Sequence, residues 1–175
     1  MIEQSQEFID VFWEEIGRLS TLKSGVDPAT QQSHIANELC KAARRVIGAD
    51  GACVVLREGQ LVHYCREDAI APMWAGQRFP IGNCISGWSI LHGVPVVIED
   101  IYTDSRIPIE YYRDTFVKSL VMQPIERTTP FGAIGVYWAK THVPSARHLR
   151  FLQALGDLAA LVLTAASLNQ AVGNL

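Results

Sequence analysis

Apolar residues recur at helical spacing close to the N-terminus. Four of them follow one another at intervals of three and four: Ile9, Phe12, Ile16 and Leu19. The residues between them are mostly charged or polar, so the apolar side chains share one face of a predicted amphipathic helix within residues 1–25. A second helix is expected from Pro28 to about Ile47, between an Asp27 N-cap and a C-terminal cap at Gly48.

Residues 52–65 contain two short runs rich in β-branched side chains, which predict a β-hairpin. We expect Glu58-Gly59 to form its turn, because glycine tolerates the backbone angles of tight hairpin turns. With that turn, Cys53 faces Tyr64 across the hairpin and not another cysteine. The four cysteines, 13, 12 and 19 residues apart, also contain no CxxC pair. Neither a disulfide nor a zinc site is therefore expected.

The stretch from residue 79 to 101 predicts a turn, a short helix and a strand. Asn83 is expected to be the N-cap of a helix over residues 84–92, with Gly93 as its C-terminal cap. Residues 94–98 predict a brief strand. The proline within that strand favours an edge position or a strand start.

The remaining chain completes a mixed pattern of helices and strands. Residues 99–116 are a polar, tyrosine-rich connection in which we expect one helix of a few turns, and strands are predicted at 117–125 and 131–139. A long helix is expected from residue 145 to about 169. One of its apolar tracks alternates spacings of four and three: Leu161, Ala165, Leu168, Val172 and Leu175. That spacing is typical of a coiled coil.

This order of elements predicts an α+β fold. We expect an antiparallel sheet of about five strands with helices on both faces and long terminal helices. The chain has 175 residues, 49% of them hydrophobic and 19% charged, which is typical of one domain that buries its own core. Its 15 basic and 18 acidic side chains give a net charge of −3, so no nucleic-acid or anionic membrane partner is expected.

Targeting and metal-binding patterns are not found. The first fifteen residues are acidic, unlike a secretory leader, and the most apolar segment, residues 158–166, is shorter than the roughly 20 residues of a membrane span. The five histidines form no HxH or HExxH pattern, so no metal is expected. We expect a cytoplasmic protein.

Three segments carry a resemblance to a known family. They are NCISGWSILHGVPVVIEDI (residues 83–101), FVKSLVMQPI (116–125) and GAIGVYWA (132–139). In this order and at these separations they resemble a GAF domain, whose fold is similar to that of PAS domains. The sequences of these segments are most similar to those of the GAF sensor modules of bacterial two-component histidine kinases.

The resemblance implies an organisation and a function. It places a GAF domain at 28–168, between a signalling or dimerisation helix at 1–25 and an extension of the last helix at 169–175. It implies a small-molecule sensor without catalysis of its own, a parallel homodimer, and an output domain such as a histidine kinase. The dimer interface would use the apolar tracks of both terminal helices: Ile9, Phe12, Ile16, Leu19, Leu161, Leu168 and Val172.

Differences from the motifs of known GAF subtypes reduce the number of possible ligands. Phe116 is followed by VKSL and not by the acidic pair of cyclic-nucleotide GAF domains, so cyclic GMP is not expected. No Cys-His dipeptide occurs, so no covalent bilin is expected. Methionine sulfoxide reductases of this fold carry a cysteine where Cys84 stands, but they need a second one, and none lies between Glu99 and Val121. The ligand and any cofactor remain unidentified.

Candidate ligand-binding residues surround the predicted short helix and the polar connection. Cys84 at a helix N-terminus is either a reactive or pocket-lining thiol or a small buried hydrophobe. The aromatic rings could stack on a planar ligand or be core, and the tyrosine-rich connection could be a lid or a solvated loop. The full set is Phe79, Cys84, Ile85, Trp88, Asp100, Tyr102, Arg106, Tyr112, Lys118, Met122 and Trp138.

Three hypotheses follow. The first is a dimeric sensor in which ligand binding between the sheet and the short helix biases the packing of the last helix. The second is a dimerisation and relay module with a collapsed pocket. The third is a thiol-dependent reductase of small oxidised metabolites, similar to free methionine sulfoxide reductases, which would use Cys84.

Overall fold

The computed structural model describes residues 14, 17 and 28–173. The predicted N-terminal apolar stripe (Ile9, Phe12, Ile16 and Leu19), the Asp27 cap and Leu175 lie outside the described residues. Leu168 and Val172 belong to the C-terminal part of the last helix, residues 168–173, of which the structure describes the backbone alone.

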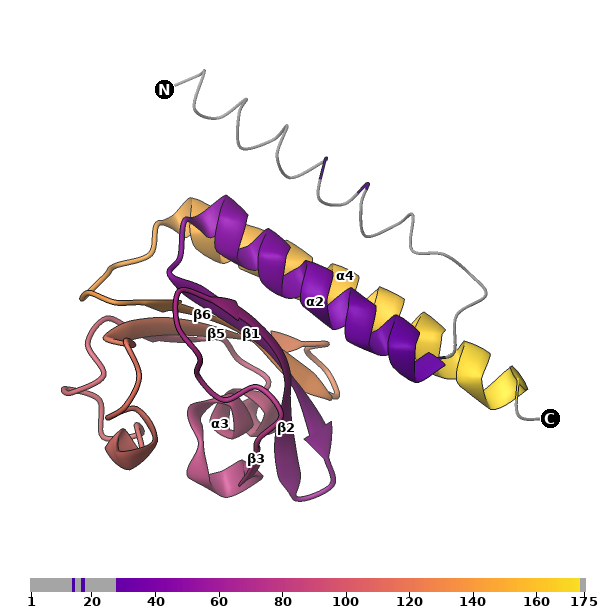
Figure 1. Ribbon diagram of the computed structural model, residues 1–175, viewed down its shortest axis with the longest axis horizontal. Coiled ribbons are helices and arrows are strands. Elements are labelled where there is room, and N and C mark those ends of the chain that lie inside the picture. The colour runs from indigo at the N-terminus through magenta and orange to yellow at the C-terminus, as the bar shows by residue number, and fades with distance from the viewer. Residues whose placement is uncertain (1–13, 15–16, 18–27, 174–175) are drawn as a thin grey trace.

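Six strands form one antiparallel sheet in the order β3-β2-β1-β6-β5-β4 (Figure 1). Their bounds are β1 Gly51–Glu58, β2 Leu61–Ala69, β3 Arg78–Pro80, β4 Val96–Ile98, β5 Ser119–Ile125 and β6 Gly132–Trp138. The helices are α2 Pro28–Ile47, α3 Ile85–His92 and α4 Ala146–Gly173, with 3-10 turns η1 Ile81–Asn83 and η2 Ile109–Tyr111. The predicted mixed fold is confirmed, with six strands in place of about five.

Helices cover both faces of the sheet. The long helices α2 and α4 lie side by side across one face, and α3 with the connection before β5 covers the other (Figure 1). Each face has its own apolar cluster. Because successive side chains of a strand point to opposite faces, Val54 faces α2 and α4 while its neighbours Cys53 and Val55 face α3.

The caps of two helices agree with the sequence. Gly48 follows α2 and has a φ of +67°, and Gly93 ends α3 in the left-handed conformation with its N–H bonded to the carbonyl of Ser89. Both conformations favour glycine because it has no Cβ. The edge position expected for residues 94–98 is also confirmed, since β4 is the last strand of the sheet.

The predicted hairpin turn is wrong by one residue. The turn is formed by Gly59 and Gln60, so Glu58 pairs with Leu61, and Cys53 lies opposite Glu67. Gly59 has a φ of +65° at the first turn position, where a two-residue hairpin requires a positive φ. All four cysteines are free.

A β-bulge in β2 displaces the pairing partner of Cys53 by one further residue. Val54 pairs with Arg66 and Val55 with Tyr64, which leaves Cys65 as an extra residue. Beyond the bulge the alternation of side chains restarts. Arg66 therefore reaches Ser33 of α2 instead of pointing to the opposite face.

Two further predictions about local structure are wrong. Cys84, not Asn83, is the N-cap of α3, because Asn83 belongs to η1. The connection at 99–116 contains only the turn η2 and no helix of several turns. Its aspartates take the backbone donors that a helix would use: Asp100 accepts from the N–H of Tyr102 and Asp104 from that of Arg106, each at 2.9 Å.

Helix α4 is longer and more apolar than the sequence analysis indicated. Its segment Ala146–Ser167 has a mean hydropathy of 1.5 and is long and apolar enough to cross a membrane by length and composition. In this fold one side of that segment belongs to the core: Phe151, Leu152, Leu155, Ala159 and Leu163 are buried. A core helix of a soluble protein passes the same composition test.

Candidate functional site

The start of α3 is held by its own backbone and by a cysteine side chain. Cys84 is extended, with φ −147° and ψ 155°, and its sulfur accepts a hydrogen bond from the N–H of Gly87 at 3.4 Å. A Cβ at Gly87 would lie 1.8 Å from the carbonyl oxygen of Ile81. Only glycine lets η1 and α3 pack this closely.

The Cys84 thiol is buried and joined to a short chain of polar groups. Its sulfur lies 3.3 Å from Oγ of Ser86, which lies 3.0 Å from the hydroxyl of Tyr64. Burial raises the pKa of the Cys84 thiol, and the contacts with Ser86 and Gly87 oppose that effect only in part. The thiol is therefore protonated at neutral pH. A helix N-terminus by itself would lower this pKa, but here burial has the larger effect.

Aromatic side chains fill the space between α3 and the sheet. Trp74 contacts Tyr64, Tyr112 and Tyr137 edge-on, with ring centroids 5.5, 5.0 and 5.5 Å apart. All four rings are at most 5% exposed. The Trp74 indole donates to the carbonyl of Tyr111 at 3.0 Å, and the Tyr137 hydroxyl lies 3.0 Å from Sγ of Cys53. This face is a packed core stabilised by aromatic contacts.

A groove of about 360 Å³ lies beside this core, between the start of α3 and the connection. Asn83, Cys84 and Trp88 form one wall, and residues 105–108, among them Arg106, form the other with residues 110 and 111. The groove is within the size range of small-molecule sites. Its walls combine an amide, a guanidinium, aromatic edges and the carboxylate of Glu110.

Arg106 is fixed in the groove wall by two interactions. Asp104 accepts from its Nε at 2.9 Å and from its Nη2 at 2.6 Å, and this ion pair lowers the pKa of Asp104. The guanidinium lies 4.9 Å from the ring centroid of Trp88, within the range of cation–π contacts. Trp88 also stacks on His92 at 4.0 Å. Because Trp88 already has two stacking partners, it is better placed to present its edge to a ligand.

The structure brings only part of the predicted set to this groove. Cys84, Trp88 and Arg106 line it, and Phe79 packs against a lining residue, Tyr111, at 4.8 Å. Three others belong to the core beneath: Ile85, Tyr112 and Met122. Asp100, Tyr102 and Lys118 form a separate group in the connection between β4 and β5. Lys118 donates to the Tyr102 hydroxyl at 2.8 Å, and Asp100 accepts from the Tyr102 N–H.

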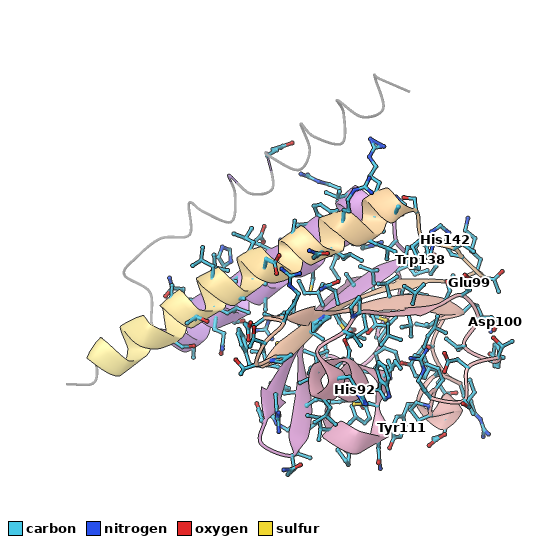
Figure 2. All side chains as sticks on the ribbon, turned by 180° about the vertical axis from the view of Figure 1, so that it is seen from behind. His92, Glu99, Asp100, Tyr111, Trp138 and His142 are labelled. Atoms are coloured by element: carbon cyan, nitrogen blue, oxygen red, sulfur yellow. The ribbon has the colours of Figure 1, made fainter. Side chains whose placement is uncertain are left out.

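Trp138 does not lie with the other candidate residues. Its side chain is 3% exposed and belongs to the apolar cluster with α2 and α4, on the opposite face of the sheet. Figure 2 shows Trp138 beside His142 near the start of α4, whereas Tyr111 and His92 lie on the α3 side. The residue facing α3 is its neighbour Tyr137. Alternation along 132–138 places Tyr137 and Trp138 on opposite faces of the sheet, and only the packing of the helices decides which of the two faces α3.

Sequence reasoning also missed other residues of this region. Asn83 and Glu110 line the groove, and Tyr64 and Tyr137 belong to the buried aromatic cluster. The register set by the turn at Gly59 pairs Tyr64 with Val55 on the α3 face, and the course of the connection brings Glu110 to the groove. Neither could be read from the apolar spacing of the chain. Within the residues that the structure describes, no three His, Cys, Asp or Glu side chains gather where they could hold a metal ion.

Comparisons with known proteins place the fold in context. A family model described as GAF domain matches residues 29–164. The GAF domain from an Acinetobacter phosphoenolpyruvate-protein phosphotransferase is similar in structure, with a TM-score of 0.78, 15% identity and 97% and 98% of the two chains covered. A search of curated proteins found no match.

Two further structures are similar. Free methionine-R-sulfoxide reductase from Neisseria meningitidis, in complex with its substrate, has a TM-score of 0.76 at 11% identity, with 93% of this chain and 91% of that chain covered. The GAF-B domain of DevS from Mycobacterium smegmatis has a TM-score of 0.66 at 18% identity, with 83% and 99% covered. At these identities the likeness shows the fold alone.

Gly87→Ala should destabilise the domain by about 1–3 kcal/mol or more, because the added Cβ forces η1 away from α3. Gly82→Ala is the matched control, since nothing lies within 4 Å of a Cβ at that position, and it should change stability by less than about 0.5 kcal/mol. Urea unfolding of both variants measures the difference. Equal effects would show that the close approach of α3 to η1 is not required.

Proposed function

The chain belongs to the GAF domain family, and from that premise we propose that it is the small-molecule-sensing input module of a cytoplasmic signal-transduction protein. The module has no catalysis of its own. It acts as a parallel homodimer and controls an output domain, most simply the histidine kinase of a bacterial two-component system.

The groove between the start of α3 and the connection before β5 carries this proposal. Asp104 occupies Nε and Nη2 of Arg106 and leaves Nη1 available to a ligand. The amide of Asn83 and the carboxylate of Glu110 add a donor and an acceptor to the same walls. Such a site selects a small polar molecule by hydrogen bonds, in a groove whose two walls come from separate elements.

A series of contacts through α3 and β5 connects the groove to the C-terminal helix α4. In α3, the hydroxyl of Ser89 donates to the carbonyl of Val94 at 2.8 Å and approaches that of Met122 in β5 at 3.5 Å. On the other face, a Cβ at Gly156 of α4 would lie 3.0 Å from the carbonyl oxygen of Pro124, also in β5. A shift of α3 on ligand binding would reach α4 through this strand, which biases α4 between two packings.

Native mass spectrometry of freshly purified protein, with a denatured control, tests the sensor. We expect a bound small molecule that is lost on denaturation. Arg106→Gln should weaken binding of that molecule at least about tenfold, the scale of one lost charged hydrogen bond. The matched control Arg113→Gln removes an exposed arginine outside the groove and should bind normally. Equal loss in both variants would contradict the assignment of the site.

A relay module without a ligand is the second candidate function. The observation that favours it is the buried cluster of Tyr64, Trp74, Tyr112 and Tyr137, which fills the space beneath α3. In that case the mass spectrum shows a dimer with no bound molecule. Both candidates require the terminal helices to pair.

The exposed side of α4 supports pairing. Leu161 is 69% exposed and Ala165 is exposed as well, although the opposite side of this helix is buried against α2 and the sheet. Leu161→Glu should shift a dimer to monomer in sedimentation, because the charge would lie in an apolar seam. Leu91→Glu, the same change at a half-exposed leucine of α3, should leave the dimer intact. Wild-type protein that sediments as a monomer at micromolar concentration would contradict this arrangement.

We also propose that Cys84 is not a nucleophile, although a free methionine sulfoxide reductase shares the fold. A raised pKa leaves little thiolate at neutral pH, and thiolate is the reactive form. The protein should therefore not reduce free methionine sulfoxide, and Cys84 should react with a thiol reagent more slowly than a free cysteine. Turnover that is abolished in Cys84→Ser would instead establish the enzyme.

A further inference from the structure

Three aromatic rings stand in series where the chain passes from the sheet into α4. Trp138 is the last residue of β6, and His142 packs on it with ring centroids 4.3 Å apart. His148, in the first turn of α4, stacks on His142 at 6.3 Å. Figure 2 shows Trp138 and His142 next to each other at this junction.

The backbone around the two histidines is hydrogen-bonded on several sides. The N–H of His142 donates to the carbonyl of Glu99 at 3.3 Å, and the carbonyl of Lys140 accepts from the Ser119 hydroxyl at 2.8 Å. The N–H of His148 donates to Oγ of Ser145 at 3.2 Å. These bonds hold the backbone that carries both rings.

The imidazoles themselves lack such partners. Nε2 of His142 and Nδ1 of His148 are the buried side-chain nitrogens or oxygens without a hydrogen-bond partner in the described part of the chain. A neutral imidazole can leave one nitrogen without a proton, but the imidazolium carries a proton on both. Protonation would therefore place an N–H in each of these buried positions with no acceptor, which is costly.

The surrounding charges act in the same direction. Lys140 disfavours the cation on His142, and His142 and Arg147 disfavour it on His148. Of the nearby acids, Glu99 contacts the loop through its backbone carbonyl, and Asp50 uses a carboxylate oxygen for the N–H of Ala139 at 2.8 Å. The face of Trp138 acts in the opposite direction, because contact with an aromatic face favours a charged His142.

We propose that Trp138, His142 and His148 form a proton-sensitive latch that holds the start of α4 on the sheet when both imidazoles are neutral and releases it when they are protonated. The latch is a property of the folded chain alone. Its use as a signal rests on the proposed function, because α4 is the helix that would carry the output. The effector at this site is the proton.

The direction of the pH dependence follows from burial. Burial, with the neighbouring cations, lowers the pKa of both histidines from the ordinary 6.5. A lowered pKa means that the released state binds more protons than the latched state. The stabilisation is complete above pH 6.5 and is lost as the pH falls from 6.5 through the folded-state values.

Two measurements on the full chain test the latch. Histidine NMR titration should give folded-state pKa values below 6.5 for His142 and His148. Hydrogen exchange at residues 149–152, corrected for the intrinsic effect of pH, should show more frequent opening of α4 at pH 5 than at pH 7.5. The expected increase is up to about tenfold for each unit by which either pKa lies below 6.5.

The double variant His142→Gln/His148→Gln should lose this pH response. His34→Gln, at an exposed histidine of α2, should keep it. Folded-state pKa values at or above 6.5 for both rings would overturn the latch, as would an undiminished response in the folded double variant. The wild-type titration decides the question even if the variant does not fold. Neither measurement involves a ligand, so failure of the latch and failure of the sensor are separate results.

Discussion

The two central strands are buried on both faces, and the rest of the structure depends on this constraint. Each side chain of β6, and each of residues 52–56 of β1, has to fit one of two cores, one under α2 and α4 and the other under α3. A shift of one residue in either strand would exchange the two sets. The bulge at Cys65 and the glycine turn at Gly59 are the points where β2 adjusts to this fixed pair.

The core under α3 determines where a ligand could be held. Trp74 and the three tyrosine rings around it occupy the space next to the sheet. The remaining room is the groove at its outer edge, where Arg106 is held against Trp88 by Asp104. The polar groups that could bind a ligand thus lie at the outer edge of α3, and the buried aromatic cluster beneath provides a packed support.

Helix α4 combines two roles in one segment. One side supplies core residues such as Leu152 and Leu155, and the other exposes Leu161. Close contact with β5 at Gly156 and the ring stack at its first turn fix the helix at two points. A change at either point would alter the surface that α4 presents, which is the property that a signalling helix requires.

The periodicity of the chain by itself determined the mixed fold, the long helices from Pro28 and at the C-terminus, the edge strand after Pro95 and the glycine caps at 48 and 93. These features depend on local backbone preference and on apolar spacing, which a sequence carries directly. The family was also evident, because its three segments keep their order. Only the tertiary structure decided that Cys84 caps α3, that Tyr137 and not Trp138 faces the site, and that Arg106 joins Trp88. Strand register, loop course and the burial of a thiol depend on contacts between distant residues, and no local pattern encodes them.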